Sequence, residues 1–261
     1  MTYDKVILIT GASRGLGRAA AQCLSRLGCS LALCARSPEI KNAPWFEAMP
    51  EARRLYAGVD LRRPDAINTF ARKVQEKFGR LDLLINCASV LGTHTSVADS
   101  AIEDWQEAVS VNILGSAAML KACCPMLRRS KGGFIQVVSS AGLLPVPHLS
   151  TYCATKAAQI MLTRAFAAEQ NEITAVNYDP SMMDTDMQTV IRTEIVPGMP
   201  EMFKQYFNRA YDDKLMIDAA DAGCTLAYTA CHLSPEQHDT RINGGDPQLQ
   251  ITAQKWFQAA L

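Results

Sequence analysis

The chain has 261 residues, with 26 Lys and Arg against 26 Asp and Glu, so its formal net charge is zero with His neutral. This balance argues against a broadly basic nucleic-acid-binding protein or a polybasic membrane-binding protein, and 48% hydrophobic residues argue against wholesale disorder. Nine cysteines without a CxxC spacing argue against a disulfide framework and a structural zinc site. Because we recognise neither a signal peptide nor an apolar run near ~18 residues, we expect a cytoplasmic protein that binds neither nucleic acid nor membrane.

Segments typical of buried strands alternate with segments of helical period along most of the chain. The first of them, from Lys5 to Thr10, is a short apolar run typical of a strand that is covered on both faces. Regular alternation predicts parallel strands with right-handed crossovers, and hence a Rossmann-type doubly wound α/β sheet of about seven strands in a single domain, residues 1–261. Strands are predicted at 5–10, 30–35, 54–59, 81–86, 133–139 and 173–178, and helices at 15–27, 65–78, 102–110, 114–129 and 152–170.

The region from Asp184 to Lys214 has a different composition, because Met, Pro and aromatic residues are frequent in it. An insertion of this kind after a strand end is typical of a helical lid over a pocket. A helical excursion packed on the domain fits the composition equally well, and the two interpretations are compatible.

A glycine-rich turn joins the first predicted strand to the first predicted helix. It reads Thr10-Gly11-Ala12-Ser13-Arg14-Gly15-Leu16-Gly17. Glycines allow a tight turn there and let backbone N–H groups approach a pyrophosphate at the positive end of the helix. Its position between strand and helix therefore predicts a dinucleotide site.

The end of the second predicted strand bears on which nicotinamide cofactor binds. An NAD enzyme usually places an acidic side chain there, against the ribose 2′-hydroxyl. Here Arg36 occupies that place, and Glu39 is the first acid that follows. Arg36 and Arg14 would suit a 2′-phosphate, which favours NADP(H) over NAD(H) unless both arginines are merely solvated.

Four residues in a fixed order complete the pattern of a catalytic site. Tyr152 and Lys156 are four apart on one predicted helix, so both face the same side. Ser139 lies thirteen residues before Tyr152, at a strand end, and Asn112 comes earlier. With the glycine turn, this order and spacing resemble the short-chain dehydrogenase/reductase superfamily over the region from Lys5 to about Thr185.

The resemblance implies a role for each member of this tetrad. Tyr152 would act as acid and base, Ser139 would hold the substrate oxygen, and Asn112 would keep a water in line for proton relay from Lys156. An unperturbed tyrosine, with a pKa near ~10, is a weak acid for this task. The Lys156 ammonium and an oxidised nicotinamide would both favour the phenolate. Lys156 would also bond the nicotinamide ribose.

The same resemblance implies a set of cofactor contacts. Asp60 and Leu61 would contact the adenine, and Thr185 the carboxamide. Cys87 and Ser89 depart from the Asn-Asn-Ala-Gly of the family, and Ser181 replaces the glycine of its Pro-Gly pair. The implied cofactor residues are Gly11, Ser13, Arg14, Gly15, Leu16, Gly17, Arg36, Asp60, Leu61, Asn86, Ala88, Tyr152, Lys156, Met183 and Thr185.

The segment from Val176 to Gln188 is similar to that of sepiapterin reductases and their benzil-reductase-like relatives, which reduce pterin side-chain ketones or diketones with NADPH. Pterin reducers anchor the pterin with a C-terminal carboxylate, for which Asp246 is the candidate, although it is also typical of a turn. Asp179 either reads substrate polarity or caps the next helix. His148 lies in a loop that contacts substrate in family members, but it fits a surface position as well.

We therefore expect an NADPH-dependent reductase of a ketone or diketone, which needs no metal. Two alternatives remain open, a pterin side-chain reductase and a non-catalytic NADP(H)-binding regulator, and an intact tetrad argues against the second. The resemblance also implies a homodimer or homotetramer formed through the helices near 102–129 and 152–170. Apolar residues available for that contact are Leu114, Met119, Leu120, Ile160 and Met161.

Overall fold

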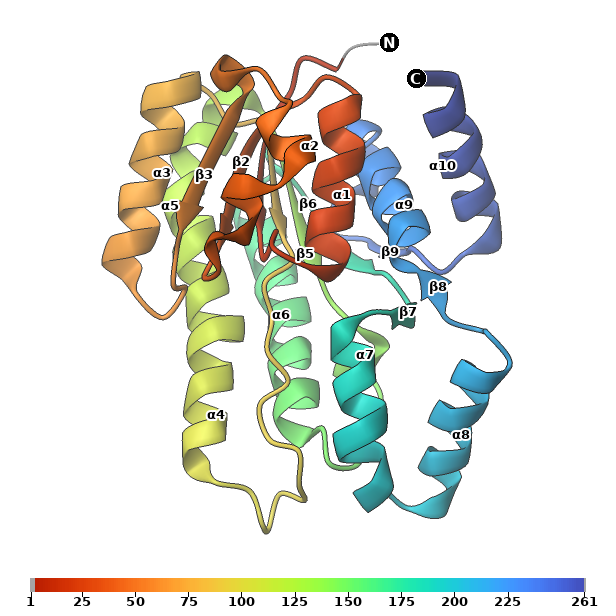
Figure 1. Cartoon of the computed structure of the whole chain (residues 1–261). Coiled ribbons are helices and arrows are strands. Elements are labelled where there is room, and N and C mark those ends of the chain that lie inside the picture. The colour runs from red at the N-terminus through yellow and green to blue at the C-terminus, as the bar shows by residue number, and fades with distance from the viewer. Residues whose placement is uncertain (1–2, 261) are drawn as a thin grey trace.

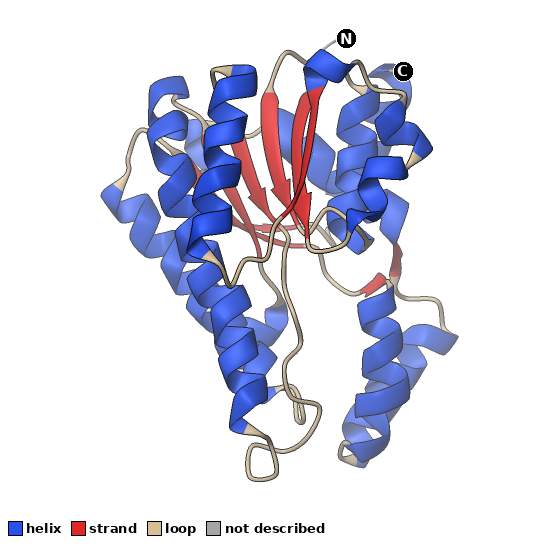
Figure 2. Cartoon of the chain, turned by 60° about the vertical axis from the view of Figure 1, so that its left-hand side comes forward, coloured by secondary structure: helices blue, strands red, loops and turns tan. Residues whose placement is uncertain are grey.

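The computed structural model describes residues 3–260, and residues 1, 2 and 261 of the expected domain lie outside this description. Its main element is a parallel seven-stranded sheet of order β3-β2-β1-β4-β5-β6-β9, which confirms the doubly wound α/β fold (Figure 2). The order reverses between β1 and β4, where doubly wound sheets bind ligands at the carboxyl ends of their strands. The strands are β1 (Val6–Thr10), β2 (Ser30–Ala35), β3 (Arg54–Gly58), β4 (Leu83–Asn86), β5 (Gly133–Val137), β6 (Thr174–Asp179) and β9 (Arg241–Asn243).

Helices cover both faces of the sheet because its strands are apolar on both sides. In β1, Ile7 and Ile9 face one core cluster, whereas Val6 and Leu8 face the other. One cluster is shared with α1, α9 and α10, and the other with α3, α5 and α6 (Figure 1). These helices are α1 (Gly15–Arg26), α3 (Pro64–Phe78), α5 (Ser116–Ser130), α6 (Ser150–Glu169), α9 (Ala219–Cys231) and α10 (Pro247–Ala260), and the short α2 (Pro44–Glu47) lies between β2 and β3.

The two helices predicted near 102–110 and 114–129 form one continuous helix. Between α4 (Ile102–Ala108) and α5, the segment Val109–Gly115 has π-helical hydrogen bonding and contains Asn112. By length and composition alone, the helix from Ile102 to Ser130 is apolar enough to cross a membrane. Its α5 part, however, packs in the core between the sheet and α3, with Met119 0% exposed.

The five residues expected at a contact between copies of the chain differ in exposure, and Ile160 is half-buried. Met119 and Leu120 are buried in the chain's own core, so the structure removes them from that role. Leu114 and Met161 are 60% and 59% exposed and remain available.

The region predicted as a lid forms a helical unit that leaves the sheet after β6 and returns before α9. Its ends are tied by a small parallel pair, β7 (Met183–Asp184) with β8 (Ile217–Asp218). Between them, α7 (Asp186–Val190) and α8 (Glu201–Asp212) lie beyond the sheet edge, at the lower right in Figure 1. This unit has its own apolar cluster, which includes Ile195, Met199 and Phe207 and also takes in Leu91 and Leu149 from the main domain.

Candidate active site

One large cavity lies at the carboxyl ends of the strands and extends from the glycine turn to the lid. Its volume is about 1380 Å³, which exceeds the ~300–1,000 Å³ typical of a pocket for one small molecule. The glycine turn, the ends of β2 to β6 and the helices α6, α7 and α8 all contribute to its wall. The cavity therefore has room for a dinucleotide together with a second, smaller molecule.

The glycine turn forms one end of the cavity, and its glycines are required by space. Gly11 has a φ of +66°, and a Cβ there would stand 2.8 Å from the backbone of Ala88. A Cβ on Gly17 would stand 2.6 Å from the carbonyl oxygen of Gly11. The two glycines thus allow the backbone of the turn to pack closely at the N-terminus of α1. The helix dipole and free N–H groups there suit a phosphate. Gly11, Ser13, Arg14, Gly15, Leu16 and Gly17 all line the cavity.

The wall next to this turn carries the charged groups expected at the adenine end. Arg36, at the end of β2, lines the cavity and lies 3.6 Å from Glu107, with both side chains about half exposed. Asp60 and Leu61 also line it. Arg62 holds the Asp60 carboxylate through both of its oxygens, and this pairing keeps the pKa of Asp60 below its usual range. Asp60 can still accept a hydrogen bond from a ligand amine, since a carboxylate offers about four lone-pair sites.

Asn86 and Ala88, predicted as neighbours in the site, have different places. Ala88 lines the cavity, but Asn86 does not. The Asn86 amide donates to Ser116 Oγ at 2.7 Å and to Gln136 Oε1 at 2.9 Å, and it accepts from Thr10 Oγ. Through these bonds Asn86 joins β1, β4 and β5 and supports the wall, and its contact with the cofactor stays a prediction.

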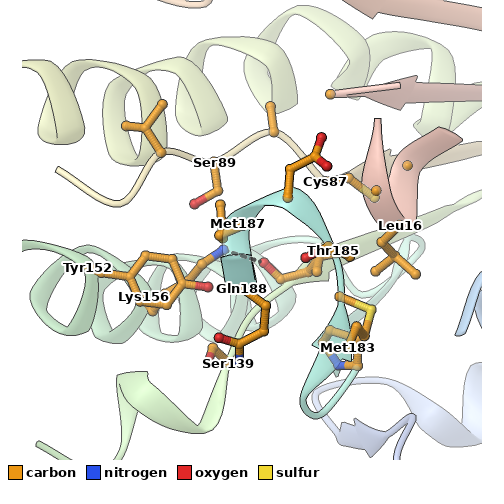
Figure 3. Close-up of a pocket in the computed structure, with 18 of the residues that line it drawn as sticks. Leu16, Cys87, Ser89, Ser139, Tyr152, Lys156, Met183, Thr185, Met187 and Gln188 are labelled. Atoms are coloured by element: carbon orange, nitrogen blue, oxygen red, sulfur yellow. Dashed lines mark hydrogen bonds between the residues drawn. The ribbon is translucent and has the colours of Figure 1, made fainter. Parts of the chain in front are cut away.

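Three members of the tetrad come together beside the lid. Ser139, Tyr152 and Lys156 all line the cavity (Figure 3). Ser139 follows the end of β5, and Tyr152 and Lys156 lie on α6. Lys156 Nζ donates to the carbonyl oxygen of Val137 at 2.9 Å and lies 5.5 Å from the centre of the Tyr152 ring. Ser139 is close enough to the Tyr152 hydroxyl for its hydrogen bond to affect the pKa of the phenol.

Burial is the main cause of the pKa shifts of Tyr152 and Lys156. Desolvation raises the pKa of Tyr152 to about 12, and the hydrogen bond with Ser139 acts in the opposite direction but is smaller. Desolvation also lowers the pKa of Lys156 to about 8, although Cys87 and Asp179 favour its ammonium. Burial has the largest effect on both pKa values, and the role of Lys156 in favouring a phenolate stays a prediction. Near neutral pH the site holds a protonated phenol, which is the form that an acid requires.

Asn112, the fourth member, does not reach the cavity. It is fully buried in the π-helical segment, where its side-chain amide exchanges hydrogen bonds with the backbone of Val90 and donates to Thr155 Oγ1 at 3.0 Å. The backbone carbonyl oxygen of Asn112 accepts hydrogen bonds from Gln159 Nε2 at 2.7 Å and from Ser116 Oγ at 2.6 Å. Asn112 therefore holds the loop at Val90 against α6, and its role in keeping a water in line for proton relay from Lys156 stays a prediction.

The three residues proposed to contact substrate on weaker grounds lie outside the cavity wall. Asp179 is buried and pairs with Arg241 on β9, and it accepts from the backbone N–H of Ser181 at 3.0 Å. Asp246 accepts from the N–H groups of Gln248 and Leu249 at the start of α10, as a capping residue does. His148 packs near Gly198 under the lid. Asp179 is thus held by an ion pair and Asp246 by a helix start, and a contact of these residues or of His148 with substrate stays a prediction.

Residues after β6 carry the wall from the sheet to the lid. Ser181, Met183 and Thr185 all line the cavity, and the Thr185 methyl group lies opposite the glycine turn. Ser181 has a φ of +65°, which strains a residue that bears a Cβ. A positive φ is a conformation that glycine adopts readily, so the serine stands at a backbone position that suits the glycine of the family.

Sequence reasoning missed most of the wall beyond Tyr152. Met187 and Gln188 on α7 and Phe203 and Phe207 on α8 all line the cavity. The composition of the 184–214 region indicated a lid, but it did not indicate which faces of its helices turn inward. The pattern of apolar residues on α8 could have indicated Phe203 and Phe207, whereas no such pattern marks Met187 or Gln188 on α7.

Comparisons with known proteins agree with this geometry. Residues 5–195 match the short chain dehydrogenase family, and the chain belongs to that family. It is 30% identical over 233 residues to a meso-2,3-butanediol dehydrogenase of Serratia marcescens, covering 88% of this chain and 89% of that one. It is also 30% identical to an NADPH-dependent pterin aldehyde reductase of Arabidopsis thaliana, over 71% of this chain and 77% of that protein.

The solved structures that it resembles have the same fold. A short-chain dehydrogenase/reductase from Saccharomyces cerevisiae superposes with a TM-score of 0.85 at 23% identity, covering 94% of this chain and 98% of that one. The family and the fold together show an oxidoreductase with a Rossmann-type domain.

Proposed function

We propose that the protein is an NADPH-dependent reductase that converts a ketone or diketone of a small molecule to an alcohol. The observation that carries this proposal is the meeting of Ser139, Tyr152 and Lys156 in one cavity with the glycine turn. The cradle at Gly11 and Gly17, which a Cβ would fill, and the N-terminus of α1 beside it fit a dinucleotide pyrophosphate. NADPH supplies, when bound, the hydride that the carbonyl carbon accepts.

The preference for NADPH rests on the charges at the end of β2. Arg36 and Arg14 both line the cavity, and the acid that follows, Glu39, lines it as well. The contact of Arg36 with Glu107 does not disable it, since an exposed ion pair of this kind contributes only about 0–1 kcal/mol. The 2′-phosphate offers Arg36 a doubly charged partner in the same place.

The chain's own groups handle the proton. Tyr152, whose pKa of about 12 keeps it protonated, donates its proton to the substrate oxygen as negative charge develops there. Ser139 donates a hydrogen bond to the same oxygen and so holds it against the phenol. Lys156 stays charged below pH 8, bonds the nicotinamide ribose and stabilises the phenolate left after the transfer.

Loss of the phenol in Tyr152→Phe tests this assignment. NADPH consumption is measured with diketones, pterins, quinones and steroids, and the variant is expected to lose about 10²–10⁴-fold in kcat, the usual contribution of a positioned acid. Tyr178→Phe is the matched control, because the buried Tyr178 hydroxyl has no partner in the described residues and lies outside the cavity wall. Equal rates in wild type and Tyr152→Phe would exclude Tyr152 as the acid. A wild type inactive on every carbonyl would favour the regulator.

We further propose that the protein forms a homodimer or homotetramer through the exposed apolar residues Leu114 and Met161. Both lie on the long helices at one face, and large exposed apolar side chains often mark contacts between chains. Sedimentation of wild type against Leu114→Glu tests this, and a monomeric wild type would exclude it.

A further inference from the structure

Most of the side chains that line the lid end of the cavity are apolar, although Asp186 and Tyr206 also line it. Val146, Leu149, Met187, Ile191, Phe203 and Phe207 form much of its wall. Gln188, the third residue of α7, lines the same cavity and is only 8% exposed. A buried amide among apolar side chains is costly unless it finds a hydrogen-bond partner, so its presence calls for one.

The amide of Gln188 has no such partner among residues 3–260. Its Oε1 is buried without a hydrogen bond among the residues that the structure describes, and none of the hydrogen bonds found there involves its Nε2. Gln136, which is also buried, differs in this respect, since its Oε1 accepts from Asn86 at 2.9 Å. An unpaired buried amide destabilises the free enzyme until a ligand supplies the missing hydrogen bond.

Gln188 lines the same cavity as the residues of the proposed chemistry. Figure 3 labels Gln188 beside Ser139 and Tyr152, which hold and protonate the reacting oxygen in the proposed function. An amide presents both an acceptor oxygen and a donor NH₂ group, so it can bond either a carbonyl or a hydroxyl. A substrate whose first carbonyl lies at Tyr152 can bring a second oxygen to Gln188.

We propose that Gln188 determines specificity by binding a second oxygen of the substrate. The substrate class is then a ketone that carries a further carbonyl or hydroxyl group beside the reacting carbonyl, on an apolar body that fills the lid end. This inference rests on the proposed function, and it adds the group that distinguishes such ketones from simple ones. A simple ketone of the same skeleton leaves the amide unpaired during the reaction and is disfavoured for that reason.

The test compares ketones of one skeleton. NADPH-dependent kcat/KM is measured for 1-phenyl-1,2-propanedione, for 2-hydroxy-1-phenyl-1-propanone and for 1-phenyl-1-propanone, which lacks the second oxygen. Wild type and Gln188→Met are compared, because Met has a similar length and needs no hydrogen bond. We expect Gln188→Met to lower the preference for the two oxygenated ketones over the simple one by about 10–100-fold, equivalent to the about 1.4–2.8 kcal/mol of one buried hydrogen bond.

Three further variants separate specificity from general damage. Gln188→Asn keeps the amide and should retain part of the preference. Met187→Leu, the neighbouring change on α7, should alter all three ketones by the same factor, because Met187 offers no strong hydrogen bond. Ser89→Ala removes the one further buried polar atom on the wall that has no partner in the described residues, the Ser89 hydroxyl, and it should leave the preference in place.

The outcomes distinguish this inference from the proposed function. If wild type reduces the ketones and Gln188→Met keeps their ratio, or if Ser89→Ala removes the preference instead, the assignment to Gln188 is wrong while the reductase remains. If wild type reduces no ketone at all, the proposed function itself fails. A loss of preference confined to Gln188→Met, with partial retention in Gln188→Asn, supports the inference.

Discussion

The two ends of the cavity are built on different principles. At the cofactor end, backbone and short loops at the strand ends form the wall, with Gly11 and Gly17 admitting the close approach. At the lid end, long flexible side chains such as Met187 and Phe203 form it, and they belong to a separate apolar cluster. Backbone at a sheet edge leaves little freedom, whereas methionine-rich walls adapt to different ligand shapes. The cofactor end therefore suits a ligand of one fixed shape, whereas the lid end suits a class of substrates that differ in shape.

The largest effect is expected at the cofactor end, where one added Cβ in Gly11→Ala should disrupt the glycine turn. Gly11→Ala adds both strain at a φ of +66° and a clash with the backbone of Ala88 at 2.8 Å. We expect a loss of about 3 kcal/mol in the free energy of unfolding, since strain and overpacking each cost about 1–3 kcal/mol. The affinity for NADPH should fall by more than tenfold. Urea unfolding and a binding titration measure the two quantities.

Gly15→Ala is the control for that change. Gly15 also has a positive φ, of +52°, but a Cβ there would meet only the Thr185 methyl group at 3.8 Å. It should cost about 1 kcal/mol, the strain alone. Equal losses in the two variants would show that the close approach to Ala88 is not what requires glycine.

The next effect concerns the charge at the cofactor end. Arg36→Ala should raise the KM for NADPH by about 10–100-fold, because a charge-assisted hydrogen bond contributes about 1.5–3 kcal/mol. The KM for NADH should change little, since NADH lacks the phosphate. Steady-state kinetics with both cofactors measure this, and Glu39→Gln is the control that keeps Arg36. A parallel rise in both KM values would contradict the phosphate role.

A smaller effect lies where the two ends meet, at Lys156. Its pKa of about 8 means that the ammonium is present below pH 8 and is lost as the pH rises through that value. The value of kcat/KM for NADPH, which reports groups of the free enzyme, should therefore fall by up to tenfold per pH unit above pH 8. Tyr152, with a pKa of about 12, is still protonated there and does not cause this fall.

Lys156→Arg separates the two groups. A guanidinium stays charged across this pH range, so whatever activity the variant retains should not decline between pH 8 and pH 10. The same decline in wild type and in the variant would assign the titration to another group.

The sequence predicted the cofactor end well and the lid end poorly, for a physical reason. The glycine turn and the spacing of Tyr152 and Lys156 are local patterns whose geometry follows from one turn or one helix. The partner of Asp179 is Arg241, sixty-two positions away on another strand, and no local pattern indicates it. Gln188 belonged to a segment that was noticed, but only the packing of α7 shows that its amide turns inward.

The smallest expected effect tests whether the strained residue between the two ends serves the substrate or is only tolerated. Ser181→Gly removes the cost of a Cβ at a φ of +65°, so the free energy of unfolding should rise by about 0.5–1 kcal/mol, less the entropy that glycine gains in the unfolded chain. Lys131→Gly, at the end of α5 with a φ of 48° and far from the cavity, is the stability control. Because Ser181 lines the cavity, its variant should also change the KM for the ketone, whereas Lys131→Gly should not. Urea unfolding and ketone kinetics on both variants measure this. An unchanged KM for the ketone in Ser181→Gly would show that the Ser181 side chain does not restrict the space available to the substrate.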